Sequence, residues 1–275
     1  MSYASLIVDA APENEGPVRF AFALAQAFGA SLTGVCTVAT PPMIGDDAFT
    51  GGAALTVLMA DYELAAQAEV RDAETRFRAL ARAANVQADW RGAVGWPPYR
   101  LVEQARLADL VVVGAHSRKA RYGSASPADV AMSAGRPVLV VPRSVPPSAL
   151  GGPALVAWKD TREARRAVAG AVPLLQRASR VHLAEVCARD DQAHAREGLA
   201  DVQTFLARHG VRSDFEVLSA EDTAAGERLL GHARDSQCDL VVAGAYGHPR
   251  LTEWILGGVT RTLIDRSPLC LLLAH

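Results

Sequence analysis

The sequence predicts an α/β fold made of two tandem parallel sheets, each doubly wound with helices on both faces. The first observation is an internal repeat: residues 108–115 read ADLVVVGA and residues 238–245 read CDLVVAGA. The second is the alternation of short apolar runs with helix-like stretches along both halves, which is typical of parallel sheets. The third is the lack of polar alternation within the apolar runs, as expected where helices cover both faces of a sheet.

The first half opens with a predicted buried strand from Ser5 to Asp9. Pro17 is expected to begin a helix, because apolar residues follow it at helical spacing as far as Phe28, and Gly29 then supplies a C-terminal stop. The same patterns predict further strands and helices. The strands are expected at 31–39, 86–94, 109–115 and 137–142, and the helices at 54–84, 97–108 and 127–134.

The second half repeats this order of elements. Its strands are expected at 154–159, 180–187, 211–217, 239–244 and 268–274, and its helices from 162, at 191–208, at 224–236 and from Gly257-Gly258. The segment between the halves, residues 143–153, is rich in proline and glycine, which marks a domain boundary. We therefore expect one domain over residues 1–145 and a second over residues 151–275.

Composition excludes several functional classes. The net charge of −2 on 275 residues lacks the concentrated positive charge that nucleic-acid binding requires. No apolar run is long enough for a membrane span and the chain start does not resemble a secretion signal, so we expect a cytoplasmic protein that binds neither membrane nor nucleic acid. The four cysteines lie in or beside apolar runs without metal-ligand spacing, and the seven histidines are scattered. We expect no metal site and no catalytic residues.

The richest candidate site is the loop after the fourth strand of the second half. Gly244 and Gly247 allow close backbone approach to a ligand, and Gly257-Gly258 opens the last helix, where free N–H groups favour phosphate. Thr260 can add a hydroxyl, and His248 can add charge. An alternative stays open at this point, in which the glycines only form a turn and cap a helix.

The pattern Gly-x2-Gly-x9-Gly after DLVVAGA resembles the ATP-binding signature of the universal stress protein family. The resemblance covers essentially the whole chain as two tandem domains. It implies a five-stranded parallel sheet per domain, of the adenine nucleotide alpha hydrolase-like type, and frequent homodimerisation through the last strand. It also implies that the loop after the first strand holds adenine and ribose, while the glycine loop and the last helix hold the phosphates of ATP or AMP, with or without Mg²⁺.

Two departures from the family pattern concern the second domain. Gly258 stands where the family usually has serine or threonine, which removes one hydroxyl that would bind phosphate. Lys159 stands where the family usually has aspartate, with Asp160 one residue later, and is expected either to meet phosphate or, in the favoured interpretation, to lie in solvent. The predicted nucleotide-binding residues are Trp158, Lys159, Asp160, Gly244, Gly247, His248, Gly257, Gly258, Val259 and Thr260.

The first domain shows the reverse pattern. Asp9 occupies the place of the family aspartate, but Ser117 replaces the second glycine of the phosphate loop. We therefore expect the nucleotide site in the second domain and a structural role for the first.

The leading hypothesis is a non-enzymatic, homodimeric stress-response regulatory protein that binds an adenine nucleotide in its second domain. The alternative is an interaction and dimerisation scaffold with vestigial phosphate loops. A third interpretation, slow ATP hydrolysis, would depend on His248 to orient water.

Overall fold

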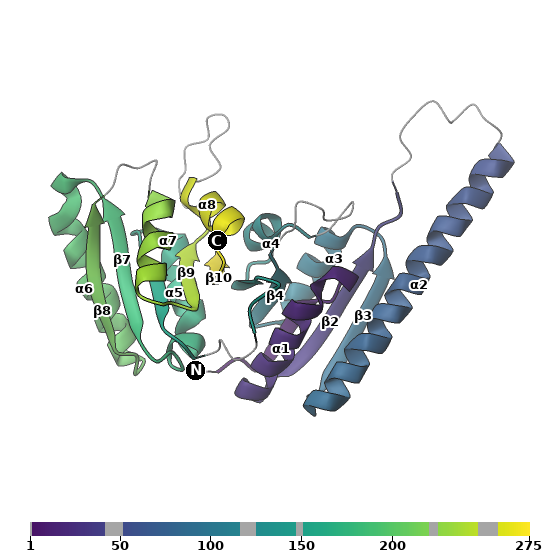
Figure 1. The fold of residues 1–275 in the computed structure, drawn as a ribbon, viewed down its shortest axis with the longest axis horizontal. Coiled ribbons are helices and arrows are strands. Elements are labelled where there is room, and N and C mark those ends of the chain that lie inside the picture. The colour runs from purple at the N-terminus through teal and green to yellow at the C-terminus, as the bar shows by residue number, and fades with distance from the viewer. Residues whose placement is uncertain (1, 42–51, 116–124, 147–150, 220–224, 247–257) are drawn as a thin grey trace.

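The computed structural model describes residues 2–41, 52–115, 125–146, 151–219, 225–246 and 258–275 (Figure 1). In the first half every strand but the last is followed by at least one helix. The elements are β1 (Ser5–Asp9), α1 (Glu15–Phe28), β2 (Ser31–Val38), α2 (Gly52–Ala84), β3 (Ala88–Val94), α3 (Pro97–Gln104), β4 (Leu110–Gly114), α4 (Pro127–Ser133) and β5 (Val138–Val141).

The second half has the same order of elements. They are β6 (Ala154–Ala157), α5 (Arg162–Leu175), β7 (Val181–Cys187), α6 (Gln192–Arg208), β8 (Ser213–Ser219), α7 (Ala225–Asp235), β9 (Leu240–Gly244), α8 (Gly258–Arg266) and β10 (Cys270–Ala274). The repeat and the doubly wound α/β class are thereby confirmed. Helix α1 begins two residues before Pro17, because a 3-10 turn at Pro12–Asn14 leads into it, and it ends as expected with Gly29 in the left-handed conformation at φ 65°.

The ten strands of the described residues form one continuous sheet, in the order β3-β2-β1-β4-β5-β10-β9-β6-β7-β8. Within each half the strands are parallel, and the halves join through an antiparallel ladder in which Leu272 of β10 faces Leu139 of β5. The edge of β10 that the family resemblance assigns to homodimerisation therefore pairs within the chain. A homodimer, if formed, needs another surface.

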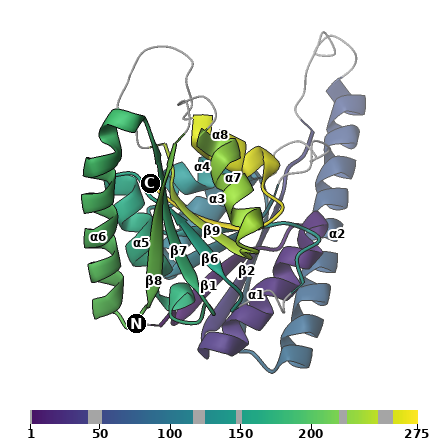
Figure 2. The ribbon, with the colours of Figure 1, turned by 60° about the vertical axis from the view of Figure 1, so that its left-hand side comes forward.

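Helices cover both faces of the joined sheet in two layers. Helices α1, α2, α5 and α6 pack on one face, and the core there includes Leu6, Leu139, Val156 and Leu272. Helices α3, α4, α7 and α8 pack on the other face, over alternate residues of the same strands. Figure 2 shows this arrangement for the second half, where β6, β7 and β8 lie between α5 and α6 on one side and α7 and α8 on the other. Each core layer contains residues of both halves, so the two repeats share their hydrophobic interior.

Further contacts between the halves form near the sheet junction. The Tyr3 hydroxyl donates a 2.6 Å hydrogen bond to the Gly170 carbonyl in α5, and the Arg177 guanidinium lies 5.1 Å from the centre of the Phe28 ring. Gly170 allows this packing, because a Cβ there would lie 2.4 Å from Pro137. Within the described residues, no helix is both long and apolar enough to cross a membrane.

Candidate functional site

The end of β9 packs directly against the first turn of α5. A Cβ on Gly244 would lie 2.6 Å from the amide nitrogen of Ala164 and 2.9 Å from the carbonyl carbon of Glu163. Glycine is therefore required at position 244 by helix–strand packing inside the protein. This packing requires glycine whether or not a ligand approaches the backbone at Gly244, as the sequence suggested.

The chain after Gly244 makes a fixed turn. Tyr246 has a left-handed backbone conformation at φ 58°, which is uncommon for a residue with a side chain. The Tyr246 N–H donates a 3.3 Å hydrogen bond to the Thr260 hydroxyl. That hydroxyl donates a 3.4 Å hydrogen bond to the Gly244 carbonyl. Thr260 is buried, so its hydroxyl ties the last helix to the end of β9 rather than standing free beside it.

The N-terminus of α8 lies beside this turn. Gly258 is the first residue of the helix and is exposed, and a Cβ there would meet no atom of the described residues within 4 Å. Val259 follows it and packs partly buried against the core. The first N–H groups of a helix have no partner within the helix and carry a partial positive charge, which favours anions. Three of the predicted site residues, Gly247, His248 and Gly257, lie outside the described residues.

The loop after β6 begins at Trp158, which continues the sheet by donating its N–H to the Ala184 carbonyl at 2.8 Å. Lys159 follows, and its ammonium lies 3.3 Å from the carboxylate of Glu185 on β7. Glu185 is buried, whereas the Lys159 side chain is 53% exposed. The favoured expectation that Lys159 lies in solvent agrees with this exposure, and the lysine in addition neutralises a buried carboxylate.

Asp160 is held by Arg165, which donates two hydrogen bonds to it at 2.6 and 3.1 Å from the first turns of α5. Thr161 caps the same helix by accepting the Ala164 N–H at 3.2 Å. The structure thus brings Trp158, Lys159 and Asp160 together on one loop, while Gly258, Val259 and Thr260 lie at the start of α8.

The sheet register changes the comparison between Asp9 and Lys159. Val8 pairs with Val112 in the first half, and Val156 pairs with Val242 at the same point of the repeat. Asp9 therefore corresponds to Ala157, two residues before Lys159. Asp9 and Lys159 thus lie at different positions of the repeat, so they do not both stand at the place of the family aspartate.

Asp9 has a structural environment of its own. Its carboxylate accepts hydrogen bonds from the Ala11 N–H at 3.2 Å and the Asn14 side-chain amide at 2.9 Å. Burial raises the pKa of Asp9 from 3.8 to about 7, since the charged form loses its hydration, and these two hydrogen bonds oppose the shift. Gly114 makes room for Asn14, because a Cβ on Gly114 would lie 2.3 Å from the Asn14 side-chain oxygen.

The four cysteines lie in the hydrophobic interior of the protein. All four cysteines are free and buried, and burial raises the pKa of the Cys36 and Cys270 thiols to about 12 and that of Cys238 to about 11. Within the described ranges there is no group of three or more metal-ligating side chains.

Sequence reasoning missed two residues that shape the site. Glu185 is the one carboxylate in the largely apolar strand VHLAEVC, and a buried carboxylate in such a strand is a signal that a partner lies nearby. Tyr246 gave no signal, since nothing in the residue type indicates a left-handed backbone.

Comparison with known proteins places the fold. The model of the universal stress protein family matches residues 6–142 and again residues 152–275. A universal stress protein from Archaeoglobus fulgidus DSM 4304 has a similar structure, with a TM-score of 0.74, 16% identity, and coverage of 100% of this chain and 96% of that chain. A protein of unknown function from Pseudomonas aeruginosa PAO1 has a TM-score of 0.61 at 17% identity, covering 99% of this chain and 92% of its own.

A universal stress protein solved in complex with cAMP matches over 52% of this chain and 100% of its own length, at 25% identity and a TM-score of 0.34. The comparison with curated proteins finds no match to the sequence. Because the family model matches both halves and together these matches span nearly the whole chain, the protein is a tandem member of the universal stress protein family.

Proposed function

We propose that the protein is a stress-response regulator that binds an adenine nucleotide, AMP or ATP, in its second domain. The phosphates would lie at the N-terminus of α8, beside the turn that follows β9. The observation that carries the proposal is the open start of this helix at Gly258, fixed to the end of β9 through Thr260. Because the turn and the start of the helix are held together, they present their N–H groups to an anion without reorganisation on binding.

The nucleotide would act by shifting an equilibrium between two conformations of the second domain. A ligand shifts such an equilibrium only through different affinities for the two states. The family usually has a hydroxyl residue at position 258, and its replacement by glycine here lowers the expected affinity. We propose no catalytic step and no residue that would require Mg²⁺.

Substitutions at Gly258 test the proposal directly, because this position has room for a side chain. Gly258→Asp places a carboxylate beside the phosphate and should weaken AMP binding at least about tenfold by repulsion, while a helix start tolerates the negative charge. Gly258→Ser restores one hydrogen bond, worth about 0.5–1.5 kcal/mol, and should strengthen binding about two- to tenfold. Isothermal titration calorimetry with AMP and ATP gives the affinities.

Gly231 in α7 provides the matched control, since a Cβ there also meets nothing within 4 Å. Gly231→Asp and Gly231→Ser should leave nucleotide affinity unchanged. If AMP and ATP show no binding at millimolar concentration to the unaltered protein or to Gly258→Ser, the proposal is wrong.

The alternative function, an interaction scaffold without nucleotide, has one observation in its favour. Gly244 is required by packing against α5, so part of the glycine pattern exists without any ligand. For the same reason a bulky substitution of Gly244 does not distinguish the two functions, because it would disturb the fold. Under the scaffold hypothesis the Gly258 variants would be indistinguishable from the unaltered protein in every ligand titration.

Homodimerisation stays a proposal and requires a surface other than β10. Large apolar side chains on the N-terminal half of α2 support such a surface, and Figure 1 shows this helix at one end of the molecule, extending past the strands. The exposed residues are Val57, Leu58, Met59, Tyr62 and Leu64. Light scattering should give a dimer mass for the unaltered protein and a monomer mass for the Leu58→Glu/Leu64→Glu variant.

A further inference from the structure

The N-terminal half of α2 is surrounded by solvent. Every residue from 56 to 65 is exposed, which covers about three turns of the helix. Figure 1 shows the reason, because this part of α2 extends past the ends of the strands. The large apolar side chains in the segment are between 42% and 63% exposed, and they are Val57, Leu58, Met59, Tyr62 and Leu64. A helix that is apolar on most of its sides is normally buried, so this segment favours a partner.

The extension of α2 belongs to the first half alone. Helix α2 has 33 residues, whereas its counterpart α6 in the second half has 17. The repeated α/β fold is therefore complete without the additional turns. Their apolar residues are available for an interaction outside the fold.

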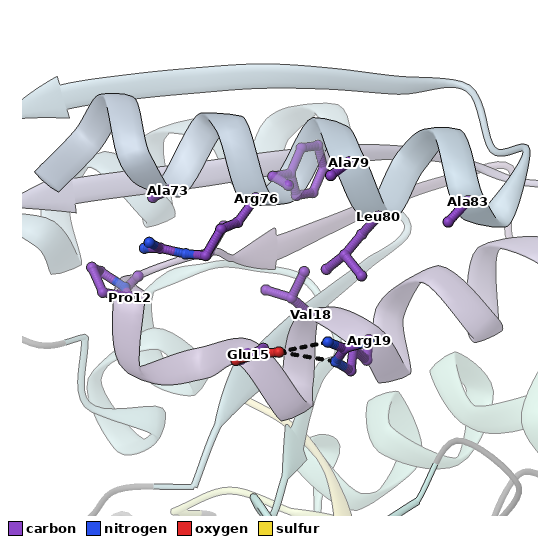
Figure 3. A pocket seen from close by; sticks show the side chains of 12 residues that line it. Pro12, Glu15, Val18, Arg19, Ala73, Arg76, Ala79, Leu80 and Ala83 are labelled. Atoms are coloured by element: carbon purple, nitrogen blue, oxygen red, sulfur yellow. Dashed lines mark hydrogen bonds and ion pairs between the residues drawn. The ribbon is translucent and has the colours of Figure 1, made fainter.

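The groove between α1 and α2 is apolar and contains an arginine without a carboxylate partner. It has a volume of about 380 Å³, and its apolar lining includes Val18, Phe77 and Leu80. Figure 3 shows Arg19 bonded to Glu15, while Arg76 extends along the groove toward Pro12. Arg76 forms no ion pair with the residues that the structure describes. A groove of this kind suits an apolar helix that carries negative charge.

The N-terminal half of α2 has that complementary charge. Between residues 52 and 70 the helix contains three carboxylates, at Asp61, Glu63 and Glu69, and no lysine, arginine or histidine. The corresponding groove of the second half, between α5 and α6, is less suitable. Four carboxylates and two cations line it, apart from His194, and both cations already pair with carboxylates. Negative charge on α2 thus favours the groove of the first half over that of the second.

One face of α2 carries both the exposed apolar residues and the residues that line the groove. The face repeats with the helical period and includes Leu55, Leu58 and Tyr62 in the N-terminal half and Ala73, Leu80 and Ala83 in the groove. A two-fold axis across the middle of the helix would bring this face of two copies together in antiparallel orientation. Each N-terminal half then lies on the groove of the other copy.

The positions of the two segments set the register of this pair. The exposed segment is centred near residue 60 and the α2 side of the groove near residue 78, which places the centres about 27 Å apart along the helix. With these centres opposed, Arg76 of one copy faces residues 61–63 of the other. Asp61 and Glu63 lie in that stretch, so the apolar contact and the charge contact form in the same arrangement.

We propose that two copies of this chain associate by reciprocal docking, in which the N-terminal half of α2 from each copy lies in the groove between α1 and α2 of the other. Leu58 and Tyr62 bury their side chains against the groove, and Asp61 and Glu63 pair with Arg76. The inference rests on the proposed homodimer and specifies which surface the exposed part of α2 contacts.

Charge reversal on either side of the contact tests the docking. Arg76→Glu and Asp61→Lys/Glu63→Lys should each raise the dimer dissociation constant at least about tenfold, because each variant places like charges opposite one another. Arg82→Glu is the matched control, since Arg82 is exposed on the same helix but does not line the groove, and it should leave the constant unchanged. Analytical ultracentrifugation gives the constants, and circular dichroism should show that all variants remain folded.

Mixing the two charge-reversal variants separates reciprocal docking from a general effect of charge. In a mixed pair, Arg76 of one copy meets Asp61 and Glu63 of the other, and the introduced glutamate meets the introduced lysines. Both contacts are then complementary. Native mass spectrometry of ¹⁵N-labelled Arg76→Glu with unlabelled Asp61→Lys/Glu63→Lys should therefore show heterodimers at concentrations where each variant alone is monomeric.

The outcomes distinguish this inference from the homodimer itself. A monomeric unaltered protein would refute both. A dimer that Leu58→Glu/Leu64→Glu dissociates and Arg76→Glu leaves intact would refute docking into the groove, while the α2 surface would still form the dimer. A mixture without heterodimers would overturn the reciprocal pairing even if each variant alone is monomeric.

Discussion

Replacing Asp9 with asparagine should change how the stability of the protein depends on pH. Asp9 is 9% exposed, and burial raises the pKa of its carboxyl group from 3.8 to about 7. The folded state therefore holds a proton over a pH range in which the unfolded state has released it. The stabilising contribution of the neutral acid is fully present below pH 3.8 and is lost as pH rises through about 7. A shift of roughly three units corresponds to about 4 kcal/mol.

Urea unfolding of the unaltered protein and of Asp9→Asn between pH 4 and pH 8 measures this effect. The difference in unfolding free energy between the two should change by about 4 kcal/mol over the range, in favour of the variant at high pH. Asparagine keeps an oxygen for the Ala11 N–H, so the local turn is retained. Asp235→Asn is the control and should run parallel to the unaltered protein. A difference between Asp9→Asn and the unaltered protein that stays constant within about 1 kcal/mol refutes the reasoning.

Four further predictions follow from packing, charge and topology. Gly244→Ala should destabilise the fold by about 1–3 kcal/mol in urea titrations, because its Cβ would contact the backbone of α5, whereas an unchanged midpoint would contradict the described packing. Lys159→Met should cost about 1–2 kcal/mol by leaving Glu185 buried without its counterion, and adding Glu185→Gln should recover most of the loss. Calorimetry should show one unfolding transition, since both core layers span the two halves, and two separate transitions would contradict a shared interior. Ellman's reagent should react slowly with the four cysteines until denaturant is added, because they are buried and burial raises the pKa values of their thiols.

The fold was largely predictable because its signals are local. The repeated DLVV strands, the helical spacing up to Phe28 and the stop at Gly29 each depend on neighbouring residues. The pairing of β5 with β10 was not predictable in the same way. Both strands are short apolar runs, and nothing in their residues distinguishes pairing within the chain from pairing with a second copy.

The candidate site was less predictable, since residue type does not reveal which group occupies the space beside it. Gly244 was interpreted as leaving room for a ligand, and the backbone of α5 takes up that room. Thr260 was predicted as a phosphate ligand, and the hydrogen bond that its hydroxyl accepts from the Tyr246 N–H was not predicted. Lys159 was expected in solvent, where most of its side chain lies, but its long-range contact with Glu185 was not predicted. Each of these contacts joins elements that are distant in the sequence.

The antiparallel junction between β5 and β10 has a consequence for how the two repeats can evolve. Two identical separate chains that associated through these strands would dissociate on dilution. Every substitution in their common sequence would be present in both copies. Here a peptide linker holds them together at any concentration, so the association needs no partner molecule. Each repeat can then specialise independently. The groove between α1 and α2, lined by Glu15, Arg19 and Arg76, already differs in charge from the groove between α5 and α6, where four carboxylates and two cations line the walls.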